Sequence, residues 1–389
     1  MTQPTEAGVA AYVAALCTDQ RGRGWDVVVA CPPCGWLADE LADRGIARLG
    51  WQAARAPGAS VASEARRLRR HVHAVRPDLV HLHSSKAGLA GRLGVRGRLP
   101  TIFQPHGWSW LAAPRATARA TLAWERFAAA WTSLFVCVGE GEAEQGRAAG
   151  VRGRFCMARS GVDLAVFGRA SDEDRRRARA RLGLSADVPL AVCVGRLTRQ
   201  KGQDVLLAAW ASARARLPDA VLALVGRGEL LEPLRRQAPP GAIFIGPVQD
   251  VWQWYAAADL VVLPSRWEGL PLTLLEALAV GRSVVGSDIP GITDALPAGA
   301  GTVVPPGDVG ALVEAITRRL AHLGLARVEG ETAARYAAAE ADIRRTFDVI
   351  DTVTAGLVNA DPSRRTTPGM RGWTRDWLCS PTRRAGSSR

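Results

Sequence analysis

Short apolar runs recur along the chain, separated by longer stretches in which apolar residues return every three or four positions. Runs rich in Val, Leu and Ile predict buried strands, and the stretches between them predict helices. We expect strands at Asp26–Cys31, Leu79–Leu82, Thr101–Gln104 and Leu134–Val138 in the first half, and at Leu190–Val194, Ala220–Val225, Ala242–Ile245, Leu260–Leu263, Ser283–Gly286 and Thr302–Val304 in the second. This alternation predicts an α/β fold with two doubly wound, Rossmann-like domains.

A charged segment, Ser171–Leu184, separates the two apolar regions and predicts an Arg-rich helix. Its acidic triplet Asp172-Glu173-Asp174 has the composition of a metal site. It lies, however, at a helix start, where carboxylates interact favourably with the positive end of the helix dipole. We therefore predict that the triplet caps the helix. The expected domains are an N-terminal, acceptor-side Rossmann-like domain at 1–165, a linker and helix at 166–187, a nucleotide-sugar-binding Rossmann-like domain at 188–345, a terminal helix at 346–361 and a disordered basic tail at 362–389.

The start of the first domain departs from the usual pattern, in which a central strand precedes a glycine turn and a helix. Gly8 and the apolar positions Tyr12 and Leu16 fit the turn and the first helix. Only the polar stretch Met1–Ala7 stands before them. The first strand of the N-terminal domain is therefore expected to be missing.

Composition narrows the class of protein. A chain of 389 residues can bury two cores, and it contains neither a long apolar run nor a signal-peptide pattern. Seven scattered Cys indicate reduced thiols and a cytoplasmic location. Of the net charge of +13, almost half comes from the tail at 362–389, and no nucleic-acid-binding motif accompanies the rest. We expect no nucleic-acid partner.

Lysine is almost absent. Only Lys86 and Lys201 are lysines, and the other 48 basic residues are Arg. This bias suggests that a lysine persists where a compact ammonium group is needed, although chance survival stays open. Both lysines stand beside glycines, in sequence contexts that can hold phosphate groups.

One motif follows the predicted strand Leu260–Leu263 and runs from Pro264 to Gly281. A strand, a Gly/Pro turn and a helix place the turn at the carboxyl edge of the sheet, where doubly wound proteins bind ligands. Amides at the helix start can bind phosphate, and the carboxylate of Glu276, one turn later, can accept ribose hydroxyls. Glu268 precedes the helix. The alternative is that both glutamates are ordinary surface acids.

A second motif follows the strand Leu190–Val194 and includes Gly195, Arg196, Lys201 and Gly202. Two cations beside a helix start can stabilise the negative charge that develops on a departing diphosphate, without a metal. The alternative is a βα turn with two surface cations. The sequence shows no convincing metal cluster, and we expect neither a metal nor a cofactor.

Together these motifs resemble retaining glycosyltransferase family 4, which has the GT-B fold of two Rossmann-like domains facing a cleft. The resemblance covers about residues 8–355. It implies that Arg196 and Lys201 hold the donor diphosphate, that Glu276 binds the ribose, and that Glu268 contacts the transferred sugar. The remaining donor-binding positions that it implies are Gly8, Gly195, Gly226, Val248, Gly269 and Leu270.

Candidate residues in the first half are fewer. The resemblance places a sugar-contacting, catalytic histidine at His106, after the strand Thr101–Gln104; from the residues alone His106 could equally be structural. His83 and Lys86, in a predicted strand-end loop, are candidate acceptor contacts, with loop packing as the alternative. Trp and Arg residues between Trp108 and Trp131 suit an anionic membrane surface or core packing.

We therefore predict a retaining, metal-independent glycosyltransferase that moves a sugar from a nucleoside diphosphate sugar to a glycan or lipid-linked acceptor. Cell-surface polysaccharide or glycolipid assembly on the inner face of the membrane is the expected setting. Two alternatives stay open at this point: a non-catalytic nucleotide-sugar-binding protein, and a two-Rossmann sugar-nucleotide epimerase.

Overall fold

The computed structural model describes residues 1–54 and 58–360, so the predicted basic tail at 362–389 lies outside the described residues. The chain forms two compact units. One comprises Met1–Pro105, Phe127–Phe135 and the chain from Ile350; the other comprises His106–Arg126 and Val136–Val349. The predicted domain boundaries at 165 and 188 stay a prediction.

The first half of the chain contributes six short strands in two sheets. A two-stranded parallel sheet pairs β1 with β2, and a four-stranded sheet has the order β3-β4-β5-β6. The strands are β1 (Val28–Cys31), β2 (Ala47–Gly50), β3 (Val80–His83), β4 (Thr101–Gln104), β5 (Leu134–Cys137) and β6 (Phe155–Met157). Helices lie between them: α1 (Ala7–Gly22), α2 (Trp36–Asp43), α3 (Val61–Val75), α4 (Ser84–Val95), α5 (Ser109–Ala112), α6 (Arg115–Ala128) and α7 (Glu140–Ala148).

Met1 and Thr2 lie between these two sheets. The Thr2 amide donates to the Ala30 carbonyl of β1 at 3.0 Å, and the His83 amide of β3 donates to the Met1 carbonyl at 2.9 Å. Thr2 also forms a parallel bridge with His83. These two residues occupy the position, between β1 and β3, at which a doubly wound sheet has its first strand.

The second half forms one six-stranded sheet of order β12-β11-β10-β7-β8-β9, in which neighbouring strands pair in parallel. Its strands are β7 (Leu190–Val194), β8 (Val221–Val225), β9 (Ala242–Gly246), β10 (Leu260–Leu263), β11 (Ser283–Ser287) and β12 (Gly301–Val304). Its helices are α8 (Asp172–Arg181), α9 (Gln203–Arg216), α10 (Leu231–Arg236), α11 (Trp252–Ala257), α12 (Leu272–Val280), α13 (Pro290–Thr293), α14 (Val309–Ala321) and α15 (Leu323–Glu340), followed by α16 (Ile343–Asn359).

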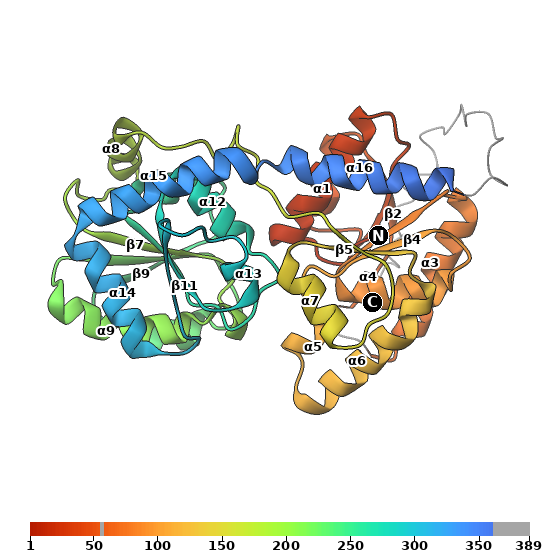
Figure 1. Ribbon diagram of the computed structural model, residues 1–389, viewed down its shortest axis with the longest axis horizontal. Coiled ribbons are helices and arrows are strands. Elements are labelled where there is room, and N and C mark those ends of the chain that lie inside the picture. Colours follow the sequence, from red (N-terminus) through yellow and green to blue (C-terminus); the bar gives the residue numbers. More distant parts are fainter. Residues whose placement is uncertain (55–57, 361–389) are drawn as a thin grey trace, which may run out of the picture. The chain divides into compact units, whose positions relative to one another are not determined.

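Helices cover both faces of this sheet (Figure 1). Successive strand residues pack into two different cores, as the period of two in a strand requires. Val192 and Val261 belong to the core that includes Tyr255 of α11, whereas their neighbours Ala191 and Leu260 belong to the core that includes Trp210 of α9. The predicted doubly wound architecture is confirmed.

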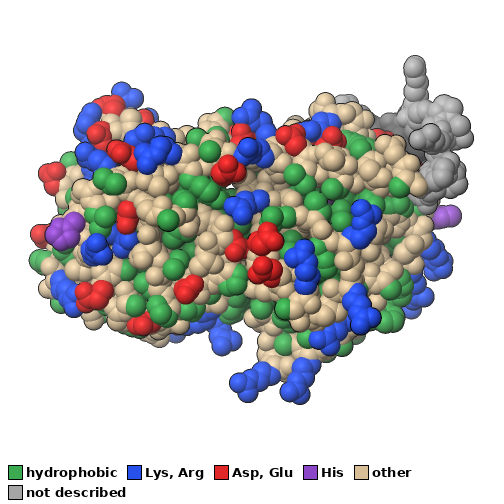
Figure 2. Space-filling view, viewed as in Figure 1, with side chains coloured by type: hydrophobic (Ala, Val, Ile, Leu, Met, Phe, Trp, Pro, Cys, Tyr) green, Lys and Arg blue, Asp and Glu red, His purple; other side chains and the backbone are tan. Residues whose placement is uncertain are grey.

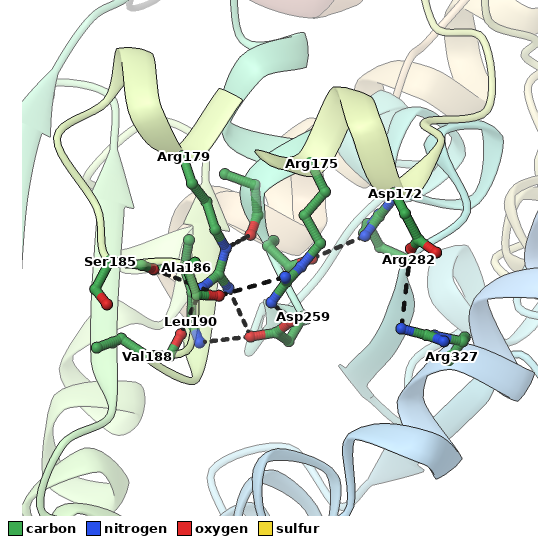
Figure 3. A network of polar contacts seen from close by, with 12 residues as sticks. Asp172, Arg175, Arg179, Ser185, Ala186, Val188, Leu190, Asp259, Arg282 and Arg327 are labelled. Atoms are coloured by element: carbon green, nitrogen blue, oxygen red, sulfur yellow. Dashed lines mark hydrogen bonds and ion pairs between the residues drawn. The ribbon is translucent and has the colours of Figure 1, made fainter. Parts of the chain in front are cut away.

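A buried polar network joins α8 to the strand starts of this sheet (Figure 3). Asp259, just before β10, accepts hydrogen bonds from Arg175 at 2.7 Å, Arg179 at 2.8 Å and the Leu190 amide at 2.9 Å. Arg179 is 1 % exposed and also donates to three carbonyls of the connection to β7. The Arg-rich helix is thus anchored to the second unit.

The strand predictions are confirmed to within two residues at each end, but β2 and β6 were missed. Neither has a buried residue: β2 is interrupted by Arg48, and the apolar run of β6 is only three residues long. The acidic triplet caps α8 as predicted: Ser171 and Asp174 form a reciprocal capping box. The predicted glycine turn is wrong, since Gly8 lies in the first turn of α1. Within residues 1–54 and 58–360, none of the helices has both the length and the hydropathy to cross a bilayer.

Candidate functional site

The strand order of the second sheet reverses between β7 and β10. From this pair, β8 and β9 extend to one side and β11 and β12 to the other. Doubly wound sheets bind ligands at such a switch point, beyond the carboxyl ends of the strands. The two loops that begin there, residues 195–202 after β7 and 264–271 after β10, carry the two motifs found in the sequence.

Glycines allow these loops to pack closely. Gly202 has φ +67°, and a side chain there would place its Cβ 2.0 Å from the Pro264 carbonyl oxygen. Gly226, after β8, has φ +141°, and its Cβ would lie 2.1 Å from the Gly195 carbonyl oxygen. Any larger residue would force the loops apart. Gly202 is therefore required for the β7 loop to contact the β10 loop.

Lys201 and Glu268 form an ion pair where these loops meet. The Lys201 Nζ lies 2.6 Å from Glu268 Oε1, and the two side chains are 14 % and 7 % exposed. Ser265 Oγ donates to the same carboxylate oxygen at 2.8 Å. The ammonium group is thus held in place by a carboxylate and remains partly accessible.

Gln200 links the two predicted cations to Glu268. Its Nε2 donates to Glu268 Oε2 at 3.2 Å and to the Trp267 carbonyl at 3.0 Å. Its Oε1 accepts from the Arg196 guanidinium at 3.3 Å. Arg196, Lys201 and Glu268 therefore belong to one hydrogen-bonded cluster at the switch point.

Glu276 lies one helical turn into α12, and Tyr255 of α11 orients its carboxylate. The Tyr255 hydroxyl donates to Glu276 Oε2 at 2.7 Å. Burial raises the pKa of Glu276, while the hydrogen bond from Tyr255 and the positive charge of Lys201 act in the opposite direction. The second oxygen, Oε1, is not engaged by Tyr255 and is suited to accept a hydroxyl from a ligand.

The other donor-binding candidates of the second half lie on neighbouring strand ends or in the β10 loop. The Gly195 amide donates to the Val225 carbonyl at 2.9 Å, and the Gly226 amide donates to the Gly246 carbonyl at 2.8 Å, so the ends of β7, β8 and β9 are joined. Val248 follows β9 and packs against the core. Gly269 and the buried Leu270 follow Glu268.

His106 and Gly107 form a turn after β4, in the same compact unit as the donor loops. Their φ angles are +55° and +102°. Burial lowers the pKa of His106 to about 3, so the imidazole is neutral at physiological pH. A Cβ built on Gly269 would lie 3.0 Å from the Gly107 amide nitrogen, which places this turn against the Glu268 loop.

The remaining candidates of the first half lie elsewhere. The predicted loop after β3 is wrong, because α4 begins at Ser84 directly after the strand. Lys86 is buried in α4, and its Nζ lies 2.7 Å from Glu64 Oε2. His83 is 4 % exposed, and its ring stacks on His81 at 4.0 Å. Gly8 belongs to the first unit. Their acceptor and donor roles stay predictions.

Sequence reasoning missed Gln200, Ser265 and Tyr255. Gln200 adjoins Lys201, and Ser265 lies within the motif Pro264–Gly281, so their positions in the two motifs could have identified them as site residues. Tyr255 precedes Glu276 by 21 residues and lies on a different helix, so nothing in the spacing connects it to the site.

Family models match most of both halves of the chain. The Glycosyltransferase Family 4 model matches residues 7–166, and the model described as Glycosyl transferases group 1 matches residues 188–322. The structure is also similar to that of Anabaena Alr3699/HepE, solved in complex with UDP and glucose, with a TM-score of 0.78, 20 % identity, and coverage of 92 % of this chain and 99 % of that one. The fold is therefore GT-B.

The chain spans about half the length of the curated relatives that it matches. One is the Escherichia coli UDP-Gal:alpha-D-GlcNAc-diphosphoundecaprenol alpha-1,3-galactosyltransferase, 29 % identical over 55 % of this chain and 58 % of the relative. Another is the GDP-mannose-dependent alpha-(1-6)-phosphatidylinositol monomannoside mannosyltransferase of Mycolicibacterium smegmatis, 38 % identical over 43 % of this chain and 48 % of the relative. Taken with the family models and the switch-point cluster, these similarities show that the chain belongs to glycosyltransferase family 4.

Proposed function

We propose that this protein transfers a glycosyl unit from a nucleoside diphosphate sugar to an acceptor hydroxyl, with retention of the anomeric configuration and without a metal. The acceptor is a glycan or a lipid-linked sugar in glycolipid or cell-surface polysaccharide assembly. Relatives that use UDP-galactose and GDP-mannose with lipid-linked acceptors support this substrate class.

The observation that carries the proposal is the cluster of Arg196, Lys201 and Glu268 at the switch point. A departing nucleoside diphosphate gains negative charge as its bond to the sugar breaks. Positioned cations stabilise that charge in the transition state. The Lys201 ammonium, fixed by Glu268 and partly accessible, suits this role.

Each other residue has a proposed place in the same reaction. Glu276 Oε1 accepts a ribose hydroxyl while Tyr255 holds Oε2. Amides at the start of α12, with Gly269 and Leu270, bind the diphosphate. Neutral His106 donates or accepts a hydrogen bond at the transferred sugar, and Gly195, Gly226 and Val248 line the nucleotide side. Gly8 and His83 keep their proposed donor and acceptor roles from the sequence, whereas for Lys86 we favour the alternative of packing, because its ammonium group is buried against Glu64.

The proposal is tested by assaying UDP-, GDP- and ADP-sugars with a polyprenyl diphosphate-linked sugar as acceptor, and by determining the anomeric configuration of the product by NMR. We expect transfer from one donor class with retention, and loss of both nucleotide binding and transfer in Glu276→Ala. Transfer that survives Glu276→Ala would overturn the site assignment. Nucleotide binding without turnover would favour a binding protein, and an epimerised sugar nucleotide formed without acceptor would favour an epimerase.

Metal independence has its own test. Because Lys201 and Arg196 are proposed to supply the positive charge, we expect the transfer rate to change by less than about twofold after treatment with EDTA. Restoration of an EDTA-sensitive rate by Mg²⁺ or Mn²⁺ would contradict this part of the proposal.

We propose, in addition, that α6 contacts an anionic membrane surface. Arg115 and Arg119 are exposed, and Phe127 is 62 % exposed near the end of the same helix. Arg side chains (blue) project from the region of α6 in Figure 2. Exposed Arg beside an exposed aromatic residue suits the headgroup region of a bilayer. Trp108, by contrast, is buried in the core.

Liposome flotation tests this surface. With vesicles that contain phosphatidylglycerol, we expect Arg115→Glu/Arg119→Glu to reduce binding by about thirtyfold or more, since each of the two cations near an anionic surface contributes about 1 kcal/mol. Arg235→Glu/Arg236→Glu on α10 is the charge-matched control. Equal binding of both variants and the unaltered protein would refute the proposal.

A further inference from the structure

Glu142 of α7 holds the turn that follows β4. Its side chain is nearly fully buried, and its two carboxylate oxygens accept from two backbone amides: Oε1 from Gly107 at 2.5 Å and Oε2 from Val138 at 2.8 Å. The Glu142 carbonyl accepts from Trp108 Nε1 at 2.7 Å. One residue therefore holds both residues that come directly after His106.

The turn requires such support. His106 adopts a left-handed backbone conformation, with φ +55°, although it carries a side chain. This conformation costs about 1–3 kcal/mol and persists only where the surrounding structure enforces it. Since Gly107 also has a positive φ, two consecutive residues after β4 leave the extended conformation of the strand.

A buried carboxylate that accepts from two amides carries a desolvation cost at this position. Burial raises the pKa of Glu142 to about 7, against the effect of the Val138 and Gly107 amides. A neutral side chain would avoid this desolvation cost, but a carboxylate is the group that offers two acceptor oxygens to two separate donors. The geometry of the turn thus depends on this side chain in particular.

We propose that Glu142 is a positioning residue for the transfer reaction, which fixes the His106 turn so that the imidazole is held at the transferred sugar. This inference rests on the proposed function, in which His106 contacts that sugar. Glu142 acts through Gly107 and Trp108 and does not itself touch the substrate. Its loss should therefore affect turnover and leave the nucleotide site intact.

The first test is Glu142→Gln. An amide retains one acceptor oxygen, so it can satisfy only one of the two backbone amides. We expect kcat for sugar transfer to fall by about tenfold to a hundredfold, as misplacement of a reacting group does. The Kd for UDP and GDP should stay within about twofold, because Arg196, Lys201 and Glu276 are unchanged. Glu140→Gln, an exposed acid in the same helical turn, is the control and should retain full kcat.

A double-mutant cycle separates positioning from a general structural role. If Glu142 acts through His106, Glu142→Gln should cost less than about twofold in kcat when it is added to His106→Ala. Independent, multiplicative losses would overturn the inference. Full activity of His106→Ala would instead refute the proposed role of His106 and remove the basis of the inference. An impaired His106→Ala beside a fully active Glu142→Gln would overturn the inference alone.

Folding is checked by thermal unfolding of each variant. If Glu142→Gln does not fold, Trp108→Phe provides a milder test, since it removes the hydrogen bond to the Glu142 carbonyl and keeps an aromatic ring at this buried position. We then expect a kcat lowered by about threefold or more with unchanged UDP affinity. An unaltered kcat in Trp108→Phe would overturn the inference.

Discussion

The only two lysines in the chain both pair with a buried glutamate, in two different regions. Lys86 and Glu64 join α4 to α3, and their side chains are 4 % and 3 % exposed. Lys201 and Glu268 join the β7 and β10 loops, and theirs are 14 % and 7 % exposed. In both pairs the carboxylate has further donors: Ser60 and the Ala54 amide for Glu64, Ser265 and Gln200 for Glu268.

What differs is the surroundings of the ammonium group. The region around Lys86 is a core of Trp51, Leu68 and Ala87, closed by helix packing. Lys201 lies in a glycine-bounded loop at the switch point, connected through Gln200 to a second cation, Arg196. The same pair of residue types can thus stabilise a helix interface in one place and receive a ligand in the other. Exposure and neighbouring loops, not the pairing itself, separate the two uses.

The largest expected effect is on stability. Lys86→Met leaves the Glu64 carboxylate buried without its counter-charge, which should lower the free energy of unfolding by about 3–5 kcal/mol. Urea unfolding followed by circular dichroism measures this change. The double variant Lys86→Met/Glu64→Leu, which removes both charges, should recover a large part of the loss. A Lys86→Met protein as stable as the unaltered one would show that the Lys86–Glu64 pair does not stabilise the helix interface.

The next effect is on activity. Lys201→Met removes a cation from the proposed diphosphate site and should lower kcat/KM for transfer by about 100- to 1000-fold. The loss of stability should be smaller than in Lys86→Met, because the Lys201 pair is more exposed than the Lys86 pair and water can compensate part of the lost charge. Lys201→Arg keeps the charge but changes its shape, and should retain more activity than Lys201→Met. If Lys201→Met mainly destabilises the protein and leaves kcat/KM intact, the proposal that Lys201 binds the donor diphosphate is contradicted.

The smallest effect concerns Glu276 and its dependence on pH. A carboxylate accepts ribose hydroxyls best when it is charged, so nucleotide affinity should fall as pH is lowered through the raised pKa of Glu276. The Tyr255 hydrogen bond favours the charged form. Tyr255→Phe should therefore raise the pKa of Glu276 further and move the loss of affinity to higher pH.

Calorimetric titration with UDP and GDP between about pH 5 and pH 8 checks this prediction. At neutral pH we expect Tyr255→Phe to weaken binding by about two- to tenfold, the usual range for one hydrogen bond. Tyr336→Phe, on α15, is a matched control. Superimposable pH profiles for Tyr255→Phe and the unaltered protein would show that Tyr255 does not tune the site.

Much of the fold followed from local pattern. The strands of the second half, such as β7 and β10, are uninterrupted apolar runs because both of their faces are buried. β2 and β6 were missed for the complementary reason: neither Ala47–Gly50 nor Phe155–Met157 has a buried residue, the first is interrupted by Arg48, and the second is only three residues long. Gly8 was misplaced because a glycine near a helix start reads as a turn, whereas here it continues the helix.

Part of the candidate site was likewise predicted from local sequence motifs. Arg196, Lys201, Glu268 and Glu276 stand in two loop-and-helix motifs whose sequence context marks them. Tyr255 and Glu142 carry no such mark, since a tyrosine or a glutamate on a helix has many structural uses. Their connection to Glu276 and to the His106 turn arises from packing between elements distant in sequence.

The sequence by itself determined the α/β class, the repeated doubly wound architecture and the two motifs of the donor site, because strand burial, glycine turns and helix starts are local properties. It also singled out both lysines through their rarity. Only the tertiary structure decided that Lys86 is enclosed with Glu64 while Lys201 lies at the switch point, and that Glu142 supports the His106 turn. These outcomes depend on which distant segments pack together, and burial and electrostatic environment are set by that packing and not by the residue type.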